Sequence, residues 1–113
     1  IFAFSMDKNK IGISLDDFCK ALSAEGIPCG AGYVKPLYLN PLYLEKKAFI
    51  FKHYKGNVKY ERGICPNSEI LNEQEVIVLP QCRPPATKED MIDILNSIQK
   101  IIDNKHEFKN SIN

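Results

Sequence analysis

The chain has 113 residues, of which 44% are apolar and 26% are charged, so its size and composition fit one globular domain. These values exclude a wholly disordered chain, a collagen and a coiled coil. The net charge of +1 gives no electrostatic indication of a nucleic acid or an anionic membrane as partner. No apolar run approaches the ~18 residues of a membrane span, and no signal peptide opens the sequence.

The first element in the chain is an apolar run at residues 2–4, typical of a strand, followed by a polar turn at 7–10. A helix is predicted next, because residues 14–17 form an S-x-x-D capping pattern. Its apolar face has the spacing i, i+3, i+4, i+7, with Leu15, Phe18, Cys19 and Leu22. Gly26 is the expected end of this helix.

Residues 31–43 differ from the rest of the chain, since they hold three tyrosines and two prolines. Pro36 and Pro41 forbid a regular helix through this segment, which predicts a structured aromatic loop. Residues 42–51 have the composition of a short helix, and residues 53–59 predict a mobile polar loop.

A second helix is predicted from residues 65–69, with Pro66 in its first turn. The β-branched run at 76–79 predicts a buried strand that Pro80 ends. Residues 83–85, Arg-Pro-Pro, predict a rigid linker.

The last predicted helix begins with a T-x-x-D capping pattern at residues 87–90. Apolar residues at helical spacing follow, namely Met91, Ile94, Leu95, Ile98, Ile101 and Ile102. We expect one domain over residues 1–104 and a polar, frayed tail over 105–113. Strands and helices mixed in this order predict an α+β fold, with a small antiparallel or mixed sheet covered by helices on one face.

The four cysteines lie far apart and do not have the spacing of a zinc site (Cys19, Cys29, Cys65 and Cys82). We interpret them as reduced thiols of a cytoplasmic protein. Cys65 precedes a helix, where a thiol can become nucleophilic. Because His53 and His106 lie in polar surroundings, a buried inert thiol is the favoured interpretation of Cys65.

The aromatic loop is the first candidate for a binding site. Tyr33, Tyr38 and Tyr43 recur every five residues, with Lys35 and Asn40 between them. Phenols and an ammonium on a proline-stiffened loop suit the binding of a sugar or a nucleotide. The alternative is that the tyrosines pack the loop onto its own domain.

Two further charged residues bear on function. Arg83 lies beside the Pro-Pro linker, where it would either clamp a carboxylate or form a surface ion pair. Glu69 lies near a helix start and is expected to interact with the helix dipole. The residues alone contain no catalytic triad, no paired-carboxylate site and no metal site.

Three sequence blocks together resemble the DegT/StrS-type sugar aminotransferases. The first comprises Glu-Gly-Ile-Pro at 25–28 and Gly-Ala-Gly-Tyr-Val-Lys-Pro-Leu-Tyr at 30–38, followed by Tyr43. The second is Tyr-x-x-Gly-x-Cys-Pro-x-x-Glu at 60–69. The third is Val-x-Val-Leu-Pro at 76–80, followed by Thr-x-Glu-Asp at 87–90. The blocks come in the family's order and cover about residues 1–103.

The resemblance is to the C-terminal, small domain of these fold-type I enzymes. It implies pyridoxal phosphate as the cofactor of a longer parent protein, which fits a sequence that begins with Ile1. The large domain, which precedes this one in the family, would supply the Schiff-base lysine and the aspartate at the pyridinium nitrogen. The fragment itself would be inactive, with no catalytic, cofactor-binding or metal-binding residue.

The resemblance further implies a nucleotide-linked keto-sugar or a cyclitol as substrate and glutamate or glutamine as amino donor. The parent would be a cytoplasmic homodimer. Tyr33, Lys35 and Tyr38 are the expected substrate-binding residues. Two alternatives remain, a non-catalytic α+β carbohydrate-binding module with an aromatic loop, and a cysteine-dependent enzyme that uses Cys65.

Overall fold

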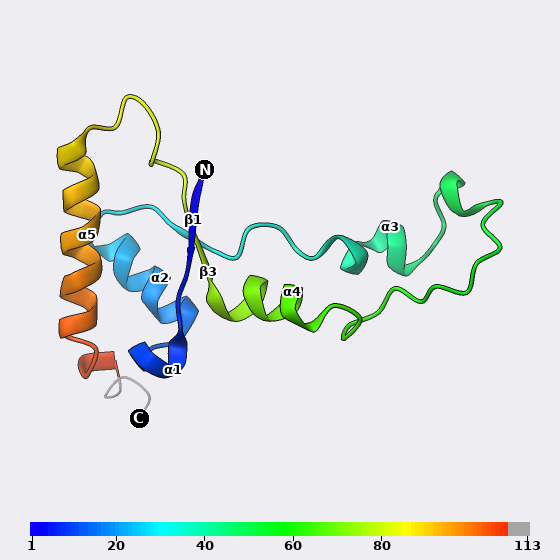
Figure 1. Cartoon of the computed structure of the whole chain (residues 1–113), viewed down its shortest axis with the longest axis horizontal. Coiled ribbons are helices and arrows are strands. Elements are labelled where there is room, and N and C mark those ends of the chain that lie inside the picture. The colour runs from blue at the N-terminus through cyan, green and yellow to red at the C-terminus, as the bar shows by residue number, and fades with distance from the viewer. Residues whose placement is uncertain (109–113) are drawn as a thin grey trace.

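A computed structural model describes residues 1–108, which form a small sheet body and a long projecting arm (Figure 1). The elements in chain order are β1 (Phe2–Ser5), α1 (Lys8–Ile11), α2 (Leu15–Ala24), β2 (Gly30–Ala31), η1 (Leu37–Leu39), α3 (Pro41–Leu44), η2 (Phe49–Phe51), α4 (Pro66–Ile70), the π-helical turn η3 (Leu71–Glu75), β3 (Val76–Leu79) and α5 (Lys88–Asp103).

The sheet has the strand order β1-β3-β2, and both pairs are antiparallel. In the register of the first pair, Phe2 lies opposite Leu79 and Phe4 lies opposite Ile77. Because side chains alternate across a strand, these four residues share one face of the sheet. The predicted α+β class is confirmed, and the sheet is antiparallel rather than mixed.

Helices α2 and α5 pack together and supply most of the core beside β3. Both helices begin at the predicted caps, since Ser14 Oγ accepts the amide of Asp17 at 3.1 Å and Thr87 forms a capping box with Asp90. The buried core consists of Met6, Ile13, Leu15, Phe18, Cys19, Leu22, Ile77, Leu79, Ile94 and Ile101. The helical periodicity read from the sequence therefore marks most of the residues that α2 and α5 bury, but Leu95, which was expected on the apolar face of the last helix, is exposed.

Three local predictions need correction or addition. The polar turn after β1 is the short helix α1, because Asp7 accepts the amides of Asn9 and Lys10. The single helix expected over residues 42–51 is split into α3 and η2, and Lys46 between them has a φ of +51°. Phe108, in the expected tail, packs against the core, whereas residues 109–113 lie outside the described part of the chain.

The arm, defined here as residues 33–75, leaves the sheet after β2 and returns to it as β3 (Figure 1). It gives the molecule extents of 54 × 41 × 20 Å and a radius of gyration of 18.3 Å, whereas a compact domain of this length has about 13 Å. The arm is thus the feature that sets this domain apart from a closed globule.

Within residues 1–108, no helix has both the length and the apolar composition needed to cross a membrane.

The core position of Leu22 leads to a first prediction. Leu22 is 0% exposed and Leu95 on α5 is 64% exposed, so the two leucines form a matched pair. We expect Leu22→Ala to lower the free energy of unfolding by about 3 kcal/mol, because it removes buried methyl groups and leaves a cavity. Leu95→Ala should change it by less than about 0.5 kcal/mol. Urea unfolding followed by circular dichroism measures both, and equal losses would contradict the described core.

Candidate functional site

The aromatic loop begins where the chain leaves the sheet at Gly32. The Gly32 amide donates to the carbonyl of Val76 at 2.7 Å, and its φ is +67°. A Cβ atom built on Gly32 would lie 2.5 Å from the backbone oxygen of Asn72. A side chain is therefore excluded both by the backbone conformation and by the close approach of the returning chain. Gly32 fixes the point from which residues 33–38 project.

Pro36 and Leu39 hold the far end of the loop. Both residues are buried, and Pro36 precedes the 3-10 turn η1. The amide of Leu39 donates to the carbonyl of Pro36 at 2.9 Å. The loop is consequently anchored on both sides, and its middle residues are left at the surface.

The three predicted substrate-binding residues lie in different environments. Tyr33 is 66% exposed, and Lys35 is also exposed. Within residues 1–108, neither the Tyr33 phenol nor the Lys35 ammonium has a hydrogen-bond or ion-pair partner. Tyr38, in contrast, is half-buried, and its hydroxyl donates to Glu69 Oε1 at 2.5 Å. Tyr33 and Lys35 are therefore available to a ligand, and Tyr38 is held by the protein.

Glu69 is the charged side chain that the sequence interpretation underestimated. It is only 8% exposed, and it lies in α4 directly after the Cys65–Pro66 start. Its Oε1 accepts the amide of Gly63 at 2.7 Å as well as the Tyr38 hydroxyl. Glu69 thus joins three segments of the arm, a role beyond the expected interaction with the helix dipole. The pairing itself was not predicted, although Tyr38 and Glu69 each close one of the sequence blocks.

Electrostatics around Glu69 favour its charged form. The hydrogen bond from Tyr38 is the largest cause that holds the pKa of Glu69 below its usual value, followed by the amide of Gly63. Arg62 adds a weaker attraction, with its Nε 3.8 Å from Glu69 Oε2. Desolvation, and then the contact with Glu69, raises the pKa of Tyr38 to about 12. Tyr38 is consequently a neutral hydrogen-bond donor at neutral pH and does not act as a base.

The cysteine hypothesis finds little support in the geometry. Cys65 is exposed rather than buried, which corrects the interpretation made from the sequence. Within residues 1–108, its thiol has no hydrogen-bond partner, and no histidine contacts it through a hydrogen bond. Cys19 is buried in the core, where desolvation raises its pKa to about 12. These thiols therefore lack the base that activates a cysteine nucleophile.

Arg83 lies outside the aromatic loop, in the segment between β3 and α5. It lines an open hollow of about 430 Å³ together with Pro28, Pro80 and Gln81. In the described residues, Arg83 forms no ion pair. The surface ion pair that was one expectation for Arg83 is therefore absent from the described residues. The other expectation, that Arg83 holds the carboxylate of a ligand, stays a prediction.

The surroundings of two lysines bear on the cofactor that the resemblance implies. A Schiff base requires an uncharged amine beside an enclosed cofactor pocket. Lys100, which lines a surface hollow, is instead paired with Glu25 at 2.7 Å, and Lys35 is exposed. Residues 1–108 also contain no cluster of three or more His, Cys, Asp or Glu side chains that could hold a metal ion.

Comparison with known proteins gives a distant similarity. No protein-family model matches the chain, and no solved structure matches it. The uncharacterized protein MJ1066 of Methanocaldococcus jannaschii is 28% identical over 102 residues, which are 90% of this chain and 23% of that protein. The chain therefore spans about a quarter of the length of this relative.

The Glu69 contact leads to a second prediction, which compares two tyrosines of one loop. Tyr38→Phe removes the hydroxyl that donates to a largely buried carboxylate, so it should lower the unfolding midpoint and expose the loop to proteolysis. Tyr33→Phe removes a hydroxyl without a protein partner and should change neither. Thermal unfolding and limited trypsin digestion measure the difference, and identical behaviour of the two variants would argue against the Tyr38–Glu69 contact.

A third prediction concerns pH. Because the hydrogen bonds from Tyr38 and Gly63 hold the pKa of Glu69 below its usual value of 4.5, the contribution of Glu69 to stability is full above about pH 4.5 and is lost as the pH falls through the folded pKa. Glu69→Gln should therefore lose less stability than the unmodified chain between pH 6 and pH 3. Urea midpoints across this range test it, with Glu61→Gln, which changes an exposed carboxylate, as the control. Parallel pH profiles for all three proteins would contradict the assignment.

Proposed function

We propose that this chain is the C-terminal, small domain of a pyridoxal-phosphate-dependent aminotransferase that acts on a nucleotide-linked keto-sugar or a cyclitol. One observation carries the proposal. Tyr38 of the first sequence block donates to Glu69 of the second block, and Glu69 also accepts the amide of Gly63. Gly32 of the first block lies against Asn72, three residues after the second block, so these contacts together fix the exposed loop. Residues that define the resemblance are thus the ones that present Tyr33 and Lys35 at the surface.

The proposal assigns different roles to the cofactor-binding domain and to this chain. Pyridoxal phosphate, held by a lysine outside this chain, would supply the electron sink for moving the amino group. This chain would supply one wall of the substrate cleft. Lys35 would pair with a phosphate of the nucleotide, and the Tyr33 hydroxyl would donate to a sugar oxygen. The stiff loop would also exclude water from the cleft.

The length of the relative is compatible with this proposal. The matched part of MJ1066 is 23% of that protein, so a chain of its size has room for a large cofactor-binding domain. In such a parent, the sheet body would close onto that domain, and the amino donor would be glutamate or glutamine. A cytoplasmic homodimer belongs to the same proposal.

The alternative is a carbohydrate-binding module without catalysis, and the 66% exposure of Tyr33 favours it. An exposed aromatic ring can stack on the apolar face of a sugar. The two proposals differ in the role of Lys35, because a neutral sugar needs no ammonium, whereas the phosphates of a nucleotide-linked sugar do.

A fourth prediction separates them in the full-length parent. Lys35→Ala removes a charge-assisted contact to phosphate, so the KM for a nucleotide-linked keto-sugar should rise roughly 10-fold or more. The affinity for pyridoxal phosphate, followed by its absorbance, should stay unchanged. Lys20→Ala on α2, whose ammonium is paired with Asp16 at 2.6 Å, is the matched control. Equal losses of substrate and cofactor affinity would mean that the loop is structural, and sugar binding without transamination would favour the module.

A further inference from the structure

The exposed apolar residues of this molecule are concentrated on the arm. Within residues 1–108 it carries twelve of the sixteen large apolar side chains that are exposed, and Phe49 at its far end is 83% exposed. Isolated exposed apolar residues are ordinary, but their concentration on one projecting segment is typical of a surface that another body covers. The arm therefore has the character of an interface rather than of a solvated loop.

The total surface area supports the same interpretation. The chain exposes 8195 Å², whereas a compact protein of its 12.9 kDa would expose roughly 6,300 Å². The difference, of more than about 1,500 Å², is comparable to the area that a standard protein interface buries. A partner that covered the arm would lower the exposed surface area to about that of a compact protein of this mass.

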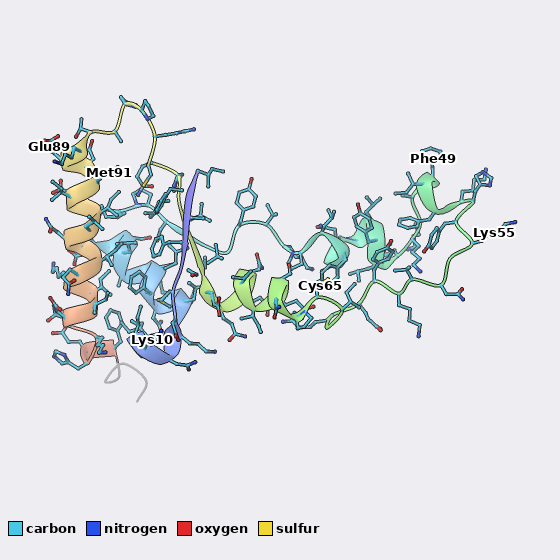
Figure 2. All side chains as sticks on the ribbon, viewed as in Figure 1. Lys10, Phe49, Lys55, Cys65, Glu89 and Met91 are labelled. Carbon is cyan, nitrogen blue, oxygen red and sulfur yellow. The ribbon has the colours of Figure 1, made fainter. Side chains whose placement is uncertain are left out.

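The distal half of the arm is strongly basic, although the whole chain is nearly neutral. Residues 45–62, called the tip from here on, hold six lysines or arginines and two glutamates, which gives a formal charge of +4 in a chain of net charge +1. Figure 2 shows Phe49 and Lys55 at the end of the molecule that lies farthest from Glu89 on α5. The tip thus combines positive charge with exposed apolar side chains.

An aromatic cluster gives the tip a defined shape. The ring of Tyr60 lies 5.3 Å from that of Tyr43 and 6.1 Å from that of Phe51, and Phe51 also meets Tyr54 edge-on at 6.1 Å. The ammonium of Lys46 lies 5.6 Å from the centre of the Tyr60 ring. Phe49 and Ile50 are outside this cluster and exposed, so the cluster presents them instead of burying them.

The charges of the tip are not neutralised within the chain. Lys47 pairs with Glu45 at 2.9 Å, and Arg62 pairs with Glu73. In the described residues, Lys52, Lys55 and Lys59 form no ion pair, and no backbone amide of residues 55–62 donates a hydrogen bond. Three ammonium groups and a length of backbone are therefore open to a partner that offers acceptors.

We propose that the tip docks on the large domain of the parent aminotransferase, on a face with carboxylates around an apolar centre. This inference rests on the proposed function, which places the loop of residues 33–38 against that domain. The arm continues from this loop to the tip (Figure 1), so the same domain is within reach of both. Phe49 and Ile50 fill the apolar centre, and Lys52, Lys55 and Lys59 pair with the surrounding carboxylates.

Hydrogen exchange in the full-length parent tests the docking. We expect the amides of residues 55–62, which donate no hydrogen bond within the described chain, to exchange at least about 10-fold more slowly than an unstructured peptide. The double variant Lys52→Glu/Lys55→Glu should lose this protection, because it places like charges against the acidic face. The control Lys88→Glu/Lys105→Glu makes the same charge change at the two ends of α5 and should keep it.

Several outcomes would overturn the inference. Exchange of the tip as fast as a free peptide in the parent would do so, as would a native protein that contains no further domain. Protection that disappears on dilution would mean that a second copy covers the tip. Protection together with an inactive, cofactor-free parent would keep the docking and refute the proposed function, whereas transamination with an unprotected tip would do the reverse.

Discussion

The arrangement of the arm depends on one buried carboxylate. Glu69 is 8% exposed, and it accepts hydrogen bonds from the Tyr38 hydroxyl and the Gly63 amide. A buried carboxylate is costly unless it is paired, so the position of Glu69 requires these donors to be in place. The contact therefore joins η1, on the outgoing segment of the arm, to α4, on the returning segment. Without that contact, Gly32 and the buried residues Pro36 and Leu39 would be left to hold the loop that carries Tyr33 and Lys35.

This tie also separates two kinds of tyrosine that look alike in the sequence. The phenol of Tyr38 is used inside the protein, whereas that of Tyr33 is free in the described structure. In the proposed site, the exposed groups would face the ligand from a loop that buried contacts hold in place. Tyr33 would then distinguish ligands, and Tyr38 would keep the geometry of the loop constant.

A near-neutral chain can still have a strongly polarised charge distribution. The tip has a formal charge of +4, and the excess of acidic side chains in the remaining sequence lowers the net charge of the chain to +1. Net charge describes the field of the molecule at long range, but contacts are made within a Debye length of about 8–10 Å. The composition therefore gave no indication of an anionic partner. The local clustering of lysines in the tip, in contrast, favours a partner with an acidic surface at that end of the arm.

The sequence by itself determined β1, α2, β3 and α5 of the sheet body. The capping patterns at Ser14 and Thr87 and the apolar periodicities of α2 and α5 are local signals, since each depends on residues within one or two turns. The strand at 76–79 was equally local, because β-branched residues followed by proline leave few other conformations. From these elements the α+β class followed.

Only the tertiary structure decided what joins Tyr38 to Glu69, because those residues are 31 positions apart and no local pattern relates them. The direction of the arm is likewise not a local property, because it depends on the two points at which the arm joins the sheet. The burial of these side chains could not be decided from the sequence either. Cys65, expected to be buried, is exposed, and Glu69, expected only to interact with a helix dipole, is buried. Burial depends on which distant segments cover a residue, and the chain fixes that only when it folds.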